Sequence, residues 1–134
     1  MTDVDSLQAA LARYFAPWVQ QLGLRALAVR PGEIVLALPV TSALVHHAGI
    51  LCGQASMAAA DTAMVLAISS DLGEFRPMTT VQFQASFLKP ISGTEAQITA
   101  RVLRRGRNLV FGEIEITGAD GKLAVHATTT CALL

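Results

Sequence analysis

Hydrophobic residues recur along the chain at two spacings, and each spacing predicts one kind of secondary structure. Near the N-terminus the spacing is three or four residues, as in an amphipathic helix, at Leu7, Leu11, Tyr14, Phe15, Trp18 and Leu22. Asp5, with Gln8 three residues later, suits the start of this helix. Pro17 is expected to kink or divide it, and Gly23 suits its end.

Extended segments follow, interrupted by one long helix. Two short strands are predicted at 24–30 and 33–40, because the Pro31-Gly32 dipeptide between them favours a turn. A long apolar helix is predicted at 52–70. Beyond it, hydrophobic and polar residues alternate with a period of two, which predicts strands at 79–90, 94–105, 108–117 and 122–134.

These elements indicate one α+β domain. Consecutive strands joined by tight turns must be antiparallel, so they form a sheet with one apolar face, and the long alanine-rich helix can cover that face. We expect an antiparallel sheet of five or six strands around a long central helix, with residues 1–134 as a single domain. Its parts are an N-terminal helix at 1–23 and a core at 24–134. In the strand at 79–90 the predicted apolar face carries Val81, Phe83, Ala85 and Phe87.

Composition narrows the class of partner. Ten acidic and ten basic residues cancel, which disfavours nucleic acid and anionic membrane surfaces. Hydrophobic residues make up 52% of the chain and charged residues 15%, a surplus best covered by a second subunit. The acidic N-terminus lacks the features of a secretory signal, so we expect a cytoplasmic protein. Cys52 and Cys131 have no metal-binding spacing, so no metal site is expected. Polar residues disfavour a membrane span in the long helix, namely Gln54, Ser56, Asp61 and Thr62.

Asp61 is the one carboxylate in the middle of that helix. Its helical neighbours three and four residues away can neither solvate nor pair it: they are Met57, Ala58, Met64 and Val65. A buried charge without partners is costly, so its presence calls for a reason. Asp61 is either a structural residue satisfied by nearby hydroxyls and amides, or it opens into a site where a poorly solvated carboxylate makes a strong base or nucleophile.

Three blocks of sequence carry a resemblance to a known family: HHAGILCGQASMAAADTAMVLAISS, TTVQFQASFLKPISGT and ARVLRRGRNLVFGEIEITGADGKLAVHATTT. Over residues 20–133 the chain resembles the hotdog-fold thioesterases of the phenylacetate-pathway (PaaI-like) family. That family's motif is Asn-x-x-Gly-x-x-His-Gly-Gly, followed by Asp or Glu eight residues after the first glycine of the pair. The resemblance implies a hotdog fold and hydrolysis of an acyl-CoA thioester, with no separate cofactor because coenzyme A is part of the substrate.

The resemblance also implies roles for individual residues. Asp61 falls on the catalytic carboxylate, which attacks the thioester carbonyl or activates water. Gly53 falls on the first glycine of the pair, whose N–H resembles an oxyanion donor, and a helix N-terminus suits that role. Gly49 matches the loop glycine. Thr80 falls near a hydroxyl position that in some members orients the attacking water.

Two positions depart from the motif. Cys52-Gly53-Gln54 stands where the family usually has His-Gly-Gly, and His46 stands where it usually has Asn or Gln. Cys52 and Gln54 are therefore substrate-binding candidates by position, and Cys52 at a helix start is also open to a role as nucleophile. His46 is a candidate donor to the carbonyl or to Asp61, with a loop histidine of no catalytic duty as the alternative.

The remaining candidates concern the substrate. Arg104 and Arg107 lie in an arginine-rich hairpin whose planar side chains suit the phosphates of coenzyme A, with Lys89 at the end of another strand. The alternative is a solvated turn that protects a sheet edge. Met64 and Val65 predict an apolar or aromatic acyl group. In the resembled family the site is shared by two subunits, which implies a homodimer or a dimer of dimers.

Three other functions remain open. A hotdog hydratase would need a histidine beside an acidic residue placed otherwise along the helix, and no such pattern is present. A non-catalytic acyl-CoA-binding protein is favoured by the departures at Cys52 and His46. A purely structural dimer module would bind no thioester.

Overall fold

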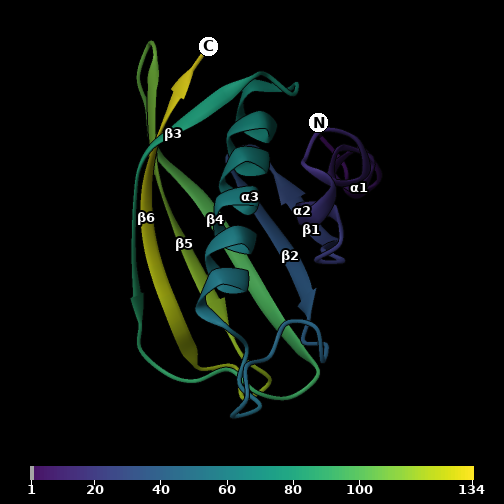
Figure 1. The fold of residues 1–134 in the computed structure, drawn as a ribbon. Coiled ribbons are helices and arrows are strands. Elements are labelled where there is room, and N and C mark those ends of the chain that lie inside the picture. Colours follow the sequence, from purple (N-terminus) through teal and green to yellow (C-terminus); the bar gives the residue numbers. More distant parts are fainter. Residues whose placement is uncertain (1) are drawn as a thin grey trace.

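The long helix α3 (Gly53–Leu72) lies along one face of a curved antiparallel sheet in the computed structural model, which describes residues 2–134 (Figure 1). Six strands form that sheet: β1 (Arg25–Arg30), β2 (Glu33–Pro39), β3 (Met78–Phe87), β4 (Glu95–Arg105), β5 (Leu109–Thr117) and β6 (Leu123–Leu133). The predicted architecture, an antiparallel sheet around a long central helix, is confirmed. In the part of the chain that the structure describes, no helix is long and apolar enough to cross a membrane.

The order of the strands differs from their order along the chain. It is β1-β2-β4-β5-β6-β3, so β3 leaves the helix and pairs with β6 rather than with β4. The hairpins β1–β2, β4–β5 and β5–β6 are local, whereas the β2–β4 and β3–β6 pairs join distant segments. As a result β3, which is ten residues long, is an edge strand with one side open to pairing.

The predicted apolar face of β3 is wrong at Val81, because the strand has a bulge there. Thr80 pairs with Cys131 and Gln82 with Thr130, so Val81 has no partner on β6. Val81 is 60% exposed, which contradicts its predicted place on the apolar face. The extra residue shifts the alternation by one, because side chains in a strand alternate with period two. Thr80 therefore faces the helix along with Phe83, as its pairing with the buried Cys131 requires.

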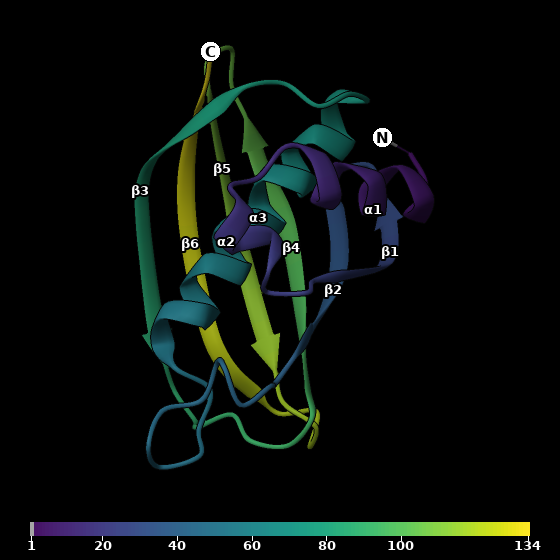
Figure 2. The same cartoon turned by 45° about the vertical axis from the view of Figure 1, so that its right-hand side comes forward.

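The N-terminal segment forms two helices on the side of the sheet that α3 occupies (Figure 2). They are α1 (Val4–Arg13) and α2 (Pro17–Gln20), so Pro17 divides the predicted helix and begins the second part. The predicted start at Asp5 and Gln8 is wrong. Asp3 is the cap, with its carboxylate accepting the Ser6 N–H at 2.8 Å. Gln8 instead joins α1 to β1, accepting the Ala26 N–H at 2.8 Å.

The core lies between α3 and the sheet. Small residues along α3 let the helix approach the strands closely, and at β5 a glycine makes room for the Met64 side chain. A Cβ atom placed on Gly112 would lie 2.5 Å from the Met64 sulfur and 2.6 Å from the Arg101 carbonyl oxygen. Only glycine fits such an approach. Met64 itself is fully buried there.

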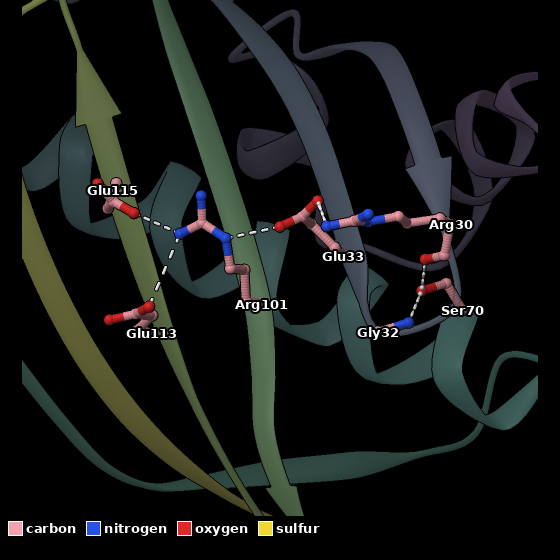
Figure 3. Close-up of polar contacts among 7 residues, drawn as sticks. All are labelled: Arg30, Gly32, Glu33, Ser70, Arg101, Glu113 and Glu115. Carbon is pink, nitrogen blue, oxygen red and sulfur yellow. Dashed lines mark hydrogen bonds and ion pairs between the residues drawn. The ribbon is translucent and has the colours of Figure 1, made fainter.

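The opposite face of the sheet carries a cluster of charges, which Figure 3 shows around Arg101. The Arg101 guanidinium contacts Glu33 at 2.6 Å on β2, and Glu113 at 3.7 Å and Glu115 on β5. Arg30 also contacts Glu33, at 2.6 Å. The hydrogen bond to Glu115 is the main reason that the pKa of Arg101 lies above its usual value. These contacts hold β2, β4 and β5 together from the outside.

Candidate active site

Asp61 lies on the one stripe of α3 that the sheet leaves uncovered. The residues of this stripe recur at helical spacing, and each of them lines one or both of two cavities beside the helix: Gln54, Met57, Ala58, Asp61 and Val65. Asp61 is half-buried, while most of the positions around it in the helix are fully buried against the strands. The sequence pattern that made Asp61 unusual therefore corresponds to a carboxylate at the margin of the core.

Thr80 holds the Asp61 carboxylate. Its hydroxyl donates a hydrogen bond of 2.7 Å to Asp61 Oδ1, and this contact depends on the β3 bulge that turns Thr80 towards α3. Within residues 2–134 no lysine, arginine or histidine lies within ion-pair distance of Asp61. The neighbouring interior is dry: Cys131, opposite Thr80, is fully buried, and burial raises the pKa of its thiol.

Two cavities meet at Asp61. The larger, about 640 Å³, lies between the N-terminal segment, α3 and the start of β3, with Val65 and Thr80 in its wall. The smaller, about 350 Å³, extends along α3 towards its N-terminus past Gln54 and Met57. Their shared wall consists of Trp18, Ala58, Asp61 and Thr80. Asp61 therefore borders a separate space on either side.

Gly53 is the first residue of α3, with Cys52 as its N-cap. An N–H in the first turn has no carbonyl partner within the helix and sits at the positive end of the helix dipole. Gly53 adjoins the Phe87 ring, since a Cβ atom on it would lie 3.4 Å from that ring. Eight residues separate Gly53 from Asp61, about 12 Å along a helix. Gly53 and Asp61 of one chain therefore cannot contact the same carbonyl group.

The loop before α3 holds His46 apart from Asp61. His46 Nδ1 accepts the Ala48 N–H at 3.1 Å, so a neutral ring carries its proton on Nε2. Gly49 turns this loop with a φ of +77°, and its N–H donates to the His46 carbonyl oxygen at 2.9 Å. His46 lines a third cavity, of about 290 Å³, together with Phe87 and Lys89. The structure thus places His46, Gly49 and Lys89 near Gly53.

The arginine hairpin lies at the other end of α3 (Figure 1). Arg104 and Arg107 are exposed there, and the neighbouring Arg105 contacts Asp71 in the last turn of α3 at 3.3 Å. Lys89, at the Gly53 end, contacts Asp120 instead. A single chain therefore does not bring Lys89 and the two arginines together. Met64 is also separate from the site, because it is buried against Gly112.

Comparison with protein families identifies the chain. The model of a family described as the thioesterase superfamily matches residues 46–125, which include the loop of His46, all of α3 and most of the sheet. The chain belongs to the thioesterase superfamily. In the part of this thioesterase-superfamily chain that the structure describes, no three histidine, cysteine or acidic side chains are grouped to hold a metal ion.

Solved structures show the same fold. A thioesterase family protein from Silicibacter pomeroyi is 27% identical with a TM-score of 0.86, covering 97% of this chain and 96% of its own. A thioesterase from Haemophilus influenzae has a TM-score of 0.89 at 24% identity, covering 100% and 92%. Zebrafish thioesterase superfamily member 2 has a TM-score of 0.87 at 22% identity, covering 100% and 99%. The last two show the fold alone, and the predicted hotdog fold is confirmed.

Sequence reasoning missed part of the larger cavity. The N-terminal segment supplies Tyr14, Phe15 and Trp18, and the turn after α3 supplies Phe75. The helical spacing did place the first three on one side of the N-terminal helix, and that was the available signal. It could not show that this side packs across α3 next to Asp61, because that contact joins segments about 45 residues apart.

Proposed function

We propose that this protein hydrolyses acyl-CoA thioesters with an apolar or aromatic acyl group, as a member of the PaaI-like group within its superfamily. One observation carries the proposal: an Asp61 carboxylate held by a hydroxyl, with no cation within ion-pair distance among residues 2–134, where two cavities meet. A carboxylate in that setting suits attack or proton abstraction more than it suits stability.

The geometry favours Asp61 as the reacting group and Thr80 as its positioning residue. Thr80 donates to Oδ1, which leaves Oδ2 as the oxygen to act. As a base, Asp61 takes a proton from water while that water adds to the thioester carbon; the C–S bond then breaks and the thiolate of coenzyme A leaves and is protonated. As a nucleophile, Asp61 attacks the thioester carbon, the C–S bond breaks and the thiolate leaves and is protonated, and water then hydrolyses the anhydride to the free acid and the Asp61 carboxylate. Both routes develop negative charge on the carbonyl oxygen and need a donor there.

That donor comes from a second subunit in our proposal. Asp61 is attached to β3 through Thr80, and Gly53 adjoins β3 at Phe87. Gln84 lies four residues after Thr80 and three before Phe87, and the bulged Val81 makes up the difference. Antiparallel pairing of the open β3 edge with the same edge of another copy, about a two-fold axis at Gln84, would set each Asp61 against the other subunit's Gly53. A homodimer would then contain two complete sites.

The same dimer supports the proposed binding of coenzyme A. Asn108, beside Arg107 in the β4–β5 hairpin, accepts the Leu133 N–H, and Leu133 pairs with Met78 at the start of β3. Antiparallel pairing therefore brings the hairpin of one subunit to the Lys89 end of the other. Lys89 and the arginines Arg104 and Arg107 would then surround one nucleotide end, which they do not do within a single chain.

The first experiment measures thiol release from acetyl-, hexanoyl-, phenylacetyl- and palmitoyl-CoA. We expect turnover by the wild type and a loss of about 100- to 10,000-fold in Asp61→Asn, the range for removing a catalytic base. Asp71→Asn, on the same helix but in an ion pair with Arg105, is the matched control and should keep its activity. Tight binding of acyl-CoA without turnover in the wild type would instead support the non-catalytic binding protein.

A second experiment tests the shared site. Gly53→Pro removes the proposed oxyanion donor at a helix position where proline is well tolerated. Gly53→Pro and Asp61→Asn homodimers should both be inactive. A mixed dimer of the two carries both defects in one site and neither in the other, so it should regain about half of the wild-type activity per dimer. Inactive mixed dimers would contradict a site built from two subunits.

A further inference from the structure

Aromatic side chains concentrate at the larger cavity. The chain has seven aromatic residues in all, one Trp, one Tyr and five Phe. Four of them line this one cavity: Tyr14, Phe15, Trp18 and Phe75. Tyr14 and Phe15 come from the segment between α1 and α2, and Trp18 comes from α2 itself. The wall of the cavity opposite α3 is therefore largely made of rings.

Three of these rings already have partners. Tyr14 and Phe75 stack with ring centres 3.9 Å apart and planes 3° apart. Phe15 meets Phe75 edge to face at 6.4 Å. Trp18 differs, because among residues 2–134 no aromatic ring is paired with it and its side chain lies outside the core cluster. It is 61% exposed, a costly position for the largest apolar side chain in the chain.

Trp18 also occupies a special position relative to the carboxylate. It is the only aromatic residue in the walls of both cavities that meet at Asp61. An acyl group that extends from Asp61 into the larger cavity therefore runs beside a wall that contains this indole. The unpaired ring, the shared wall and the neighbouring carboxylate all point to contact with the substrate.

We propose that Trp18 is the specificity-determining residue of the site and favours acyl groups that carry an aromatic ring over linear chains of similar size. The inference rests on the proposed function, because it assigns the acyl group of the same thioester. A ring that stacks on the indole gains the favourable geometry of aromatic pairs in addition to buried area, which a linear chain does not. An acetyl group carries no ring and little apolar area, so it gains almost nothing from the indole.

Kinetics with three substrates test this assignment. In Trp18→Ala we expect kcat/KM for phenylacetyl-CoA to fall about five- to tenfold, the order of one aromatic pair plus part of its area. The kcat/KM for hexanoyl-CoA should fall about twofold, and that for acetyl-CoA should be unchanged. Trp18→Phe keeps a ring and should restore most of the phenylacetyl activity. Leu103→Ala is the control, because Leu103 is similarly exposed, at 52%, but lies on β4 outside both cavities. Equal losses for all three substrates would overturn the proposal.

Fluorescence gives a readout that does not depend on turnover. Trp18 is the only tryptophan, so protein emission excited in the tryptophan band reports on this one site. In the Asp61→Asn background, phenylacetyl-CoA should shift the emission to shorter wavelength and acetyl-CoA should not. Hydrolysis in the wild type with unshifted emission would refute the role of Trp18 and leave the proposed function standing. An emission shift with phenylacetyl-CoA but not acetyl-CoA, together with no hydrolysis by the wild type, would refute the proposed thioesterase activity. It would still support binding of an aromatic ring at Trp18.

Discussion

Asp61 and Glu113 are both half-buried carboxylates, and the sheet lies between them. Glu113 belongs to the cluster on the outer face, with Arg101 at 3.7 Å and His126 at 3.2 Å. Asp61, on the inner side, has the Thr80 hydroxyl and no cation within ion-pair distance among residues 2–134. The same chemical group is paired with cations on the outer face of the sheet and has a hydroxyl as its partner where the cavities meet.

After Asp61→Asn, the largest expected effect comes from Thr80→Val, which removes the hydrogen bond to Asp61 without changing side-chain volume much. Hydrogen bonds to charged groups contribute about 1.5–3 kcal/mol, so we expect kcat to fall about 10- to 100-fold. KM should change little, because in this proposal Thr80 positions Asp61 and does not bind the acyl group. Steady-state kinetics with the best substrate of the panel measure both parameters.

The matched control for that change is Thr129→Val. Thr129 is buried on β6, and its hydroxyl donates to the Gln82 carbonyl oxygen at 2.9 Å. It is therefore also a threonine with a hydrogen-bonded hydroxyl, but no hydrogen bond among residues 2–134 joins it to Asp61. It should lower the free energy of unfolding by about 1 kcal/mol and leave kcat unchanged. Rescue of activity by Thr80→Ser would support the positioning role. Equal kcat in Thr80→Val and wild type would contradict it.

A smaller effect, on stability alone, is expected from Arg101→Met. This change removes the cation on β4 that Glu33 on β2 shares with Glu113 and Glu115 on β5. Because Arg101 is 36% exposed and partly screened by solvent, we expect the free energy of unfolding to fall by about 1–2 kcal/mol, less than for a fully buried pair. Denaturant unfolding measures the change, and thioester hydrolysis should be unaffected.

Arg25→Met provides the comparison for Arg101. Arg25 forms a single ion pair with Glu95 at 3.2 Å, and both side chains are close to half exposed. Loss of this ion pair should lower the free energy of unfolding by less than about 0.5 kcal/mol. If both variants unfold alike, the outer cluster contributes no more than an isolated surface pair, and the contrast drawn between the two faces of the sheet fails.

The smallest effect concerns the accessibility of the interior next to Asp61 to water, which the reactivity of the two cysteines reports. Cys131 is fully buried opposite Thr80, and burial raises the pKa of its thiol, whereas Cys52 is half-buried at the start of α3. Iodoacetamide at mildly alkaline pH should therefore modify Cys52 and spare Cys131 until the protein is unfolded in urea. Peptide mass mapping identifies the modified residue. Rapid labelling of Cys131 in the folded protein would show that water reaches this interior.

The secondary structure was predictable because its signals are local. Spacing alone located α3 and the six strands within a few residues, and Pro17 divided the N-terminal helix as expected. The first helix cap was assigned to Asp5 instead of Asp3, since both are followed by a polar residue three positions later. The apolar partners of Asp61 also marked it as unusual without any structure. Its proposed role remains a prediction until the variants are measured.

The sequence by itself determined the elements, the antiparallel hairpins and the single carboxylate of the long helix, because each depends on residues a few positions apart. Only the tertiary structure decided that β3 pairs with β6, that the bulge at Val81 turns Thr80 towards Asp61, and that Trp18 borders both cavities. These features arise from contacts between segments far apart in the chain. Strand register and helix packing set them, and neither is encoded in local spacing.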